Sequence, residues 1–249
     1  MNISWDITDK DIQNIKKVLI ENENPFLINR RKRNVQRQNI VINEDAVIKT
    51  MIACLLTSQQ RSGPNSAVGR FLSKEPFHIT FESISNVDDD IEDYLKQELK
   101  KNDLTRYVNR ISRFFASNIK KIRKDNWSII KKLESLKYID SKEEERKIAD
   151  KLNNDYDGFG PKQARNFLQS LGLTRYEIPI DSRITNWLNT FGFPVSLSSS
   201  SLGDKGYYHF VSDGIQELCR QAEIYPCILD AAIFSSFDNG AWTDENAIF

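Results

Sequence analysis

The chain has 249 residues, with 35 basic and 35 acidic side chains, and 39% of its residues are hydrophobic. This length and hydrophobic content are enough for one large core or two modest ones, and they argue against a disordered or fibrous protein. The sequence has no run of about twenty apolar residues, which a membrane-spanning helix needs. Its first residues lack the basic-then-apolar pattern of a signal peptide, so we expect a cytoplasmic, nucleoid or nuclear protein that is not secreted.

The cysteines and histidines indicate neither a disulfide framework nor a metal site. Cys54, Cys219 and Cys227 lie in or beside apolar stripes, so we expect small, reduced core residues. His78 and His209 are far apart and have no partner at metal-ligand spacing. The sequence therefore predicts no metal and no catalytic zinc.

Apolar residues recur with helical spacing almost throughout the chain, and no alternating strand pattern extends beyond a few residues. The sequence therefore predicts an all-α protein. The first helix is expected to begin at Thr8. Arg30 to Arg33, together with the nearby Arg37, form a basic cluster. Such a cluster can bind phosphate groups even in a chain of zero net charge.

A second predicted helix begins after Asn43 and carries an apolar stripe up to Leu56. It ends in the polar segment Thr-Ser-Gln-Gln-Arg, in which the last three residues are Gln59, Gln60 and Arg61. On their own these residues are equally well explained as solvated side chains at a helix end or as side chains that reach a ligand.

A second basic region lies at residues 96–124, which hold ten basic side chains against two acidic ones. Arg106, Arg110 and Arg113 are predicted to share one helix face, opposite Tyr107 and its apolar neighbours. Such a face is either simply solvated or directed at phosphates, and the pattern does not separate these alternatives.

A helix, a glycine turn and a second helix follow in the middle of the chain. Ser141 begins a capping sequence for a helix that we expect to end near Asp155. Gly158 and Gly160 form the turn, and Pro161 is suited to the first position of the next helix. Most turns of this kind only connect elements, but the glycines leave room for backbone N–H groups to face a phosphate oxygen.

Lys162 and Asp181 turn this hairpin into a candidate active site. Lys162 falls in the first turn of the second helix, where the positive end of the helix dipole favours a neutral, nucleophilic amine. The alternative is a surface lysine that covers apolar neighbours or meets a phosphate. Asp181 precedes an apolar stripe that runs from Ile184 to Phe191, so we expect it to be an N-cap. An ionised carboxylate there can also accept a proton from a lysine or stabilise positive charge on a sugar.

Residues 158–188 resemble the core of the helix-hairpin-helix DNA glycosylase superfamily. The run Gly-Phe-Gly-Pro-Lys-Gln-Ala-Arg-Asn-Phe-Leu, which starts at Gly158, is most similar to the small 8-oxoguanine DNA glycosylase/AP lyases. The resemblance implies that Lys162 and Asp181 are catalytic and that Gly158 and Gly160 contact DNA. It implies base excision through a lysine Schiff base, followed by β-elimination, on damaged double-stranded DNA.

The resemblance extends to the polar segment after the second predicted helix. It implies that Gln59, Gln60 and Arg61 bind DNA and that Gln59 fills the space left by an extruded base. No redox cofactor, catalytic metal or obligate protein partner is implied, although the family leaves room for a monovalent cation at the hairpin. Alternatives are a non-catalytic DNA-binding module, a helical scaffold for protein partners and a monofunctional alkyl-base glycosylase.

The family also implies an all-α fold of two lobes with a cleft between them. Residues 44–174, which include the helix-hairpin-helix at about 141–172, would form one helical lobe, and residues 1–43 and 175–249 would form the other. The candidates for lining the base pocket are all aromatic: Trp187, Phe191, Trp242 and Phe249.

Overall fold

The computed structural model describes residues 4–58, 60–87, 90–238 and 242–243. Within these ranges the chain is helical and contains no strand, which confirms the all-α prediction, and no helix there is long and apolar enough to cross a membrane. In chain order the α-helices are α1 (Asp9–Glu21), α2 (Pro25–Arg30), α3 (Glu44–Leu56), α4 (Ala67–Leu72), α5 (Phe81–Asn86), α6 (Ile91–Lys101), α7 (Val108–Lys124), α8 (Ser128–Ser135), α9 (Lys142–Asp155), α10 (Pro161–Ser170), α11 (Ser182–Phe191), α12 (Lys205–Gln221) and α13 (Pro226–Ser236). A π-helical turn, η1 (Arg31–Val35), continues α2, and two short 3-10 turns are η2 (Leu136–Tyr138) and η3 (Ser201–Gly203).

Side-chain caps determine where several helices begin. Thr8 closes a capping box on α1, and the side chains of Asn43 and Ser141 accept backbone N–H groups at the starts of α3 and α9. Pro161 is the first residue of α10. These starts were predicted from the sequence and are confirmed, because a cap depends on residues within one turn of each other.

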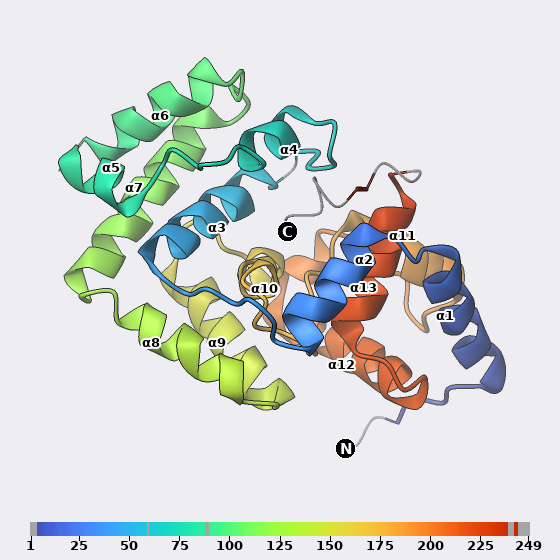
Figure 1. The fold of residues 1–249 in the computed structure, drawn as a ribbon. Coiled ribbons are helices and arrows are strands. Elements are labelled where there is room, and N and C mark those ends of the chain that lie inside the picture. The colour runs from blue at the N-terminus through green and yellow to red at the C-terminus, as the bar shows by residue number, and fades with distance from the viewer. Residues whose placement is uncertain (1–3, 59, 88–89, 239–241, 244–249) are drawn as a thin grey trace.

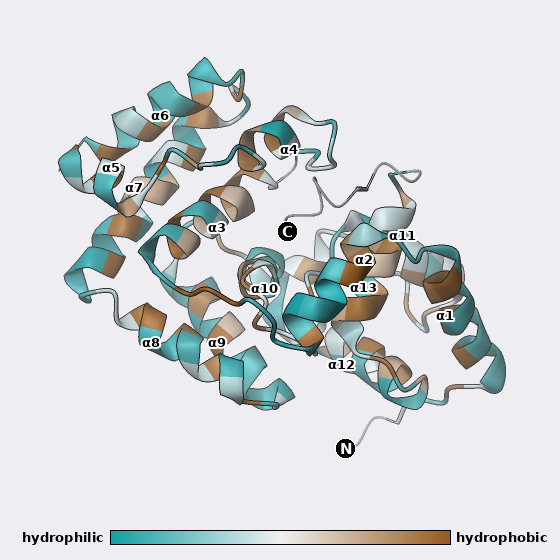
Figure 2. Cartoon of the chain, viewed as in Figure 1, coloured by the Kyte–Doolittle hydropathy of each residue, from teal (hydrophilic) through white to brown (hydrophobic). Residues whose placement is uncertain are grey.

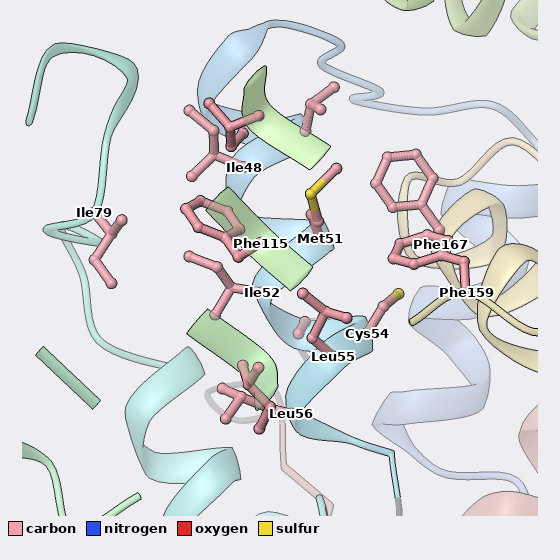
Figure 3. Close-up of a cluster of buried hydrophobic side chains, with 14 of the residues drawn as sticks. Ile48, Met51, Ile52, Cys54, Leu55, Leu56, Ile79, Phe115, Phe159 and Phe167 are labelled. Atoms are coloured by element: carbon pink, nitrogen blue, oxygen red, sulfur yellow. The ribbon is translucent and has the colours of Figure 1, made fainter. Parts of the chain in front are cut away.

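The first hydrophobic cluster comprises buried residues between Ile42 and Leu173, and α3 lies at its centre. Nine of the 13 residues of α3 are buried, as expected of a helix covered on all sides. In Figure 3, Phe115 of α7 lies on one side of α3, and Phe159 of the hairpin and Phe167 of α10 lie on the other. This packing holds the hairpin and α10 against α3.

The second hydrophobic cluster combines buried residues from the beginning of the chain with buried residues from Ile178 to Trp242. Its central helix is α13, which packs against α1, α2, α11 and α12. Figure 2 shows hydrophobic residues on α13, whereas α6 and α9 carry more hydrophilic residues. One charged side chain, Asp230, lies buried in the middle of α13.

The helix α10, which carries Lys162, lies between two groups of helices, one around α3 and the other around α13 (Figure 1). Its C-terminal end is capped by three arginines of the basic cluster that begins at the last residue of α2. Arg33 donates a hydrogen bond to the Ser170 carbonyl at 2.8 Å, and Arg37 donates one to the Gly172 carbonyl. Arg30 makes a longer contact of 3.4 Å with the Gln169 carbonyl.

The basic cluster was predicted from the sequence to be a candidate phosphate-binding group. For Arg30, Arg33 and Arg37 that interpretation is wrong. Their positive charges complement the negative end of the α10 dipole. Burial lowers the pKa of Arg33 to about 10, with the nearby charge of Arg30 acting in the same direction. The cluster therefore connects the two groups of helices and fixes the axis of α10.

Candidate functional site

A cavity of about 730 Å³ opens at the N-terminal end of α10. Its walls come from the end of α3, the glycine hairpin, the first turn of α10, the start of α11 and the inner face of α13. Both candidate catalytic residues, Lys162 and Asp181, line it, together with Gly158 and Gly160. The structure thus brings two side chains 19 positions apart in sequence into one concave site.

The two hairpin glycines have different roles. Gly158 has φ +80°, and a Cβ there would come within 2.6 Å of the Phe114 ring and 2.8 Å of a Leu55 methyl group, so glycine is required. Gly160 has φ −85°, and a Cβ there would meet no protein atom within 4 Å. The backbone at Gly160 therefore does not need glycine for its φ angle, and the absent Cβ leaves open space there.

Gly160 is the N-cap of α10, and no side chain among the described residues caps that helix end. The first N–H groups of a helix have no intrahelical acceptor, and together with the helix dipole they favour an anion. The open space in front of Gly160 is where such an anion can approach the backbone.

Lys162 is half-buried in the first turn of α10. Its Nζ donates a hydrogen bond of 3.4 Å to Gln163 Oε1, which is too long to hold the amine tightly. The neighbouring Cys54 of α3 is buried, and burial raises the pKa of its thiol to about 12, so the group stays a neutral thiol. All three cysteines are free and buried, as the sequence predicted.

Asp181 is the N-cap of α11, as predicted. Its Oδ1 accepts the N–H groups of Arg183 at 2.8 Å and Ile184 at 3.0 Å. Its Oδ2 takes part in neither bond. One carboxylate oxygen thus fixes the side chain on the helix end, and the capping bonds leave the other oxygen unused.

Asp230 is a further cavity residue that sequence reasoning missed. Its side chain is buried, lines the cavity and accepts a hydrogen bond of 2.6 Å from Gln169 Nε2. Burial raises the pKa of Asp230 to about 7, the negative charge of Asp181 raises it too, and the positive charge of Arg30 acts in the opposite direction. The available signal was a lone carboxylate in the apolar run Cys-Ile-Leu-Asp-Ala-Ala-Ile-Phe, because a buried charge is rare without a task or a partner.

Three buried polar atoms of residues that line the cavity have no hydrogen-bond partner among the described residues. They are Arg30 Nε, Gln169 Oε1 and Trp242 Nε1. Phe26 and Phe234 belong to the same wall, with ring centroids 5.4 Å apart, and Phe26 lies 4.4 Å from Trp242. The inner wall therefore combines aromatic surface with two free N–H donors, a free amide oxygen and a carboxyl group.

The segment after α3 contributes to the mouth of this cavity. Gln60 and Arg61 both line it, and Gln60 Nε2 donates a hydrogen bond to the Leu56 carbonyl at 3.0 Å. Gln59, the residue predicted to fill the space of an extruded base, lies outside the described residues.

Two of the four aromatic residues predicted to line the base pocket do not line this cavity. Trp187 and Phe191 stack on each other, with centroids 4.8 Å apart, and pack against the second hydrophobic cluster. Trp242 does line the cavity, and Phe249 lies outside the described residues. The helical spacing of the first two residues reflects ordinary core packing.

The arginine face of α7 also differs from the prediction. Tyr107 lies before the helix, with φ +58°, and both Arg106 and Arg110 place their guanidinium groups over its ring, at 5.0 and 4.4 Å from the centroid. Tyr107 is therefore on the arginine side, because the helical period does not extend to a residue outside the helix. Arg106 lines the mouth of the cavity.

Within the described ranges, no three His, Cys, Asp or Glu side chains gather in a way that could hold a metal ion. Comparison of the chain with protein-family models and with curated proteins finds no match.

Proposed function

We propose that this protein is a bifunctional DNA glycosylase/AP lyase that acts in base excision repair on an oxidised purine, above all 8-oxoguanine. The observation that carries the proposal is that Lys162 and Asp181 line one cavity, with one oxygen of Asp181 left over from its capping role. Residues 44–174 would form one lobe of the enzyme and residues 1–43 with 175–249 the other.

The inner wall of the cavity suits an everted base. An enzyme that acts on a base must take it out of the helical stack into a pocket of aromatic and hydrogen-bonding groups. Phe26, Phe234 and Trp242 offer ring surface, and Asp230 and Gln169 offer oxygens that accept N–H groups. An oxidised purine such as 8-oxoguanine carries an N7–H donor that guanine lacks, so the free acceptor Gln169 Oε1 on this wall would favour the oxidised base.

The chemistry follows from the amine and the carboxylate. The Lys162 nitrogen forms a bond to C1′ as the C1′–N9 bond breaks, and the bonding electrons leave with the base. Asp181 accepts the proton that the amine releases and stabilises positive charge on the sugar. Cleavage of the C1′–O4′ bond, with a proton taken up by O4′, opens the sugar ring and gives a Schiff base. Transfer of a C2′ proton to water then breaks the C3′–O bond, expels the 3′ phosphate and nicks the strand.

The duplex would be held at the rim of the cavity. The uncapped N-terminus of α10 and the open space at Gly160 would receive one phosphate, which positions the strand without reading its sequence. Arg61 and Arg106 supply positive charge at the same mouth. Local charge of this kind allows a chain of zero net charge to bind DNA in a salt-dependent manner.

The test is an assay of base release and strand nicking on duplexes that contain 8-oxoguanine, uracil, thymine glycol or an undamaged guanine. The wild type is expected to release 8-oxoguanine and nick the strand, and Lys162→Gln is expected to do neither. The matched control is Lys151→Gln, which removes an exposed lysine of α9 that pairs with Asp155. Salt-dependent duplex binding without any reaction would favour the non-catalytic module, and base release without nicking would favour a monofunctional glycosylase.

A further inference from the structure

Residues 173–180 lead directly to Asp181. This segment has no regular secondary structure but is mostly buried. Buried backbone groups need hydrogen-bond partners, and an irregular segment cannot supply them to itself. Two main-chain bonds link it to residues outside the segment, from the N–H of Leu173 to the carbonyl of Leu168 at 2.9 Å and from the N–H of Cys227 to the carbonyl of Arg175 at 3.0 Å. Side chains from other helices supply several of the remaining partners.

The first part of the segment is held by two buried carboxylates. Glu145 of α9 accepts the N–H groups of Arg175 and Tyr176 at 2.8 Å and that of Glu177 at 3.0 Å. The Glu177 side chain in turn accepts hydrogen bonds from Arg165 of α10 at 2.7 Å and Arg146 of α9 at 2.8 Å. The segment is thereby tied to α10, the helix that carries Lys162.

The last part of the segment, next to Asp181, is held by Tyr208 of α12. Its hydroxyl donates to the Ile178 carbonyl at 2.8 Å and accepts the N–H of Ile180 at 2.7 Å. Tyr208 is fully buried, and burial raises the pKa of its hydroxyl, so the group keeps its proton at neutral pH. The face of the ring lies 4.7 Å from the Arg165 guanidinium.

One side chain therefore contacts both the segment that ends at Asp181 and the helix that carries Lys162. Its hydroxyl binds the residue directly before Asp181, and its ring packs on an arginine that lies three residues after Lys162 in the same helix. The hydroxyl is also fully used, since it makes one bond as donor and one as acceptor to the backbone of the segment.

We propose that the Tyr208 hydroxyl is a positioning group that fixes Asp181 relative to Lys162 for the base-excision step. This inference rests on the proposed glycosylase function. Removal of the hydroxyl leaves the Ile178 carbonyl and the Ile180 N–H without their partner, so the segment that ends at Asp181 loses its nearest anchor. A small displacement of a catalytic group is enough to lower a rate strongly.

The test compares Tyr208→Phe with Tyr207→Phe. The first change removes the hydroxyl and keeps the buried ring. The second makes the same change on the neighbouring residue of α12, whose exposed hydroxyl makes a long contact of 3.4 Å with the Ser196 carbonyl. Single-turnover release of 8-oxoguanine is expected to fall about 10- to 100-fold in Tyr208→Phe. It is expected to change by less than about twofold in Tyr207→Phe.

Two further measurements separate positioning from loss of the fold. Borohydride trapping on a ready-made abasic site is expected to stay within about threefold of wild type in Tyr208→Phe, because the aldehyde needs the Lys162 amine but little help from Asp181. Duplex affinity is expected to stay within the same range. Equal losses of excision, abasic-site trapping and duplex affinity, or unchanged excision, would overturn the inference.

Hydrogen exchange at the Ile180 amide gives a readout that does not depend on activity. Exchange there is expected to become about tenfold faster or more in Tyr208→Phe and to stay unchanged in Tyr207→Phe. Unchanged exchange in Tyr208→Phe contradicts the anchoring role. A wild type that neither excises nor traps refutes the proposed function instead, and the exchange rates still decide whether the hydroxyl holds the segment.

Discussion

Asp230 in the centre of α13 gives a prediction about stability as well as function. Replacing it with asparagine keeps the size of the side chain and an oxygen that can accept the hydrogen bond from Gln169. The replacement removes the charge that the buried carboxyl group carries at high pH. We therefore expect Asp230→Asn to be more stable than the wild type in mild alkali, equally stable in acid, and impaired in base excision.

The magnitude follows from the raised pKa of Asp230. Burial moves this pKa from 3.8 to about 7. Because each pKa unit corresponds to about 1.4 kcal/mol, ionising the group in the folded protein costs about 4 kcal/mol more than in the unfolded chain. Between these two values the folded protein keeps a proton that the unfolded chain has lost. The free energy of unfolding therefore decreases as the pH rises from about 4 to about 7.

Urea unfolding of both proteins across this pH range measures the effect. Asp230→Asn is expected to exceed the wild type by about 2 to 4 kcal/mol above pH 7 and to match it near pH 4. Burial also raises the pKa of Glu145 to about 7, but Glu145 is present in both proteins, so its contribution cancels in the difference.

The control is Asp213→Asn, which removes a half-exposed carboxylate that pairs with Arg146. Such a pair contributes at most about 1 kcal/mol, so this variant should differ little from the wild type at every pH. A stability difference for Asp230→Asn that is the same in acid and alkali, or a loss of stability in alkali, would refute the reasoning.

Three other variants test the hairpin, the cap and the basic cluster. Gly158→Ala is expected to lower the free energy of unfolding, measured in urea, by about 2 to 4 kcal/mol, because of strain at positive φ and the clash with Phe114. A decrease of less than about 0.5 kcal/mol would contradict this expectation. Gly160→Ala, with no neighbour within 4 Å, should instead keep its stability and bind duplex DNA several-fold more weakly, as fluorescence anisotropy can measure. Asp181→Asn should keep its melting temperature and duplex affinity, because asparagine also caps a helix. Its single-turnover excision rate should fall about 100-fold or more. An equal loss of duplex binding would mean that the residue is only a cap. Arg33→Met removes the 2.8 Å hydrogen bond to the Ser170 carbonyl and should lower the free energy of unfolding by about 1 to 3 kcal/mol. The salt dependence of duplex binding should stay the same. A weaker salt dependence would show that this arginine contacts phosphate.

The features of the fold that sequence analysis predicted correctly are local ones. Asn43, Ser141 and Asp181 were recognised as caps because a cap and the N–H groups that it accepts lie within three residues. The turn at Gly158 and the helix start at Pro161 follow from backbone restrictions of single residues. The all-α class follows from the same spacing rules applied along the chain.

The features that were missed depend on contacts between distant parts of the chain. Arg33 and Arg37 look like surface charges until the C-terminal end of α10 is placed beside them, more than 130 residues away in sequence. The partner of Asp230 is Gln169, 61 residues away, and only the packing of α10 beside α13 shows that this carboxyl group lines the cavity. Tyr107 was assigned to the wrong face because its backbone leaves the helix at positive φ.

Borohydride trapping tests the central claim most directly, because it detects the covalent bond between the Lys162 amine and the sugar. The wild type is incubated with a duplex that contains 8-oxoguanine or an abasic site, reduced, digested and analysed by mass spectrometry. The account predicts an adduct on the peptide that contains Lys162 and none in Lys162→Gln. An adduct on a different lysine, or no adduct with any lesion, would contradict it.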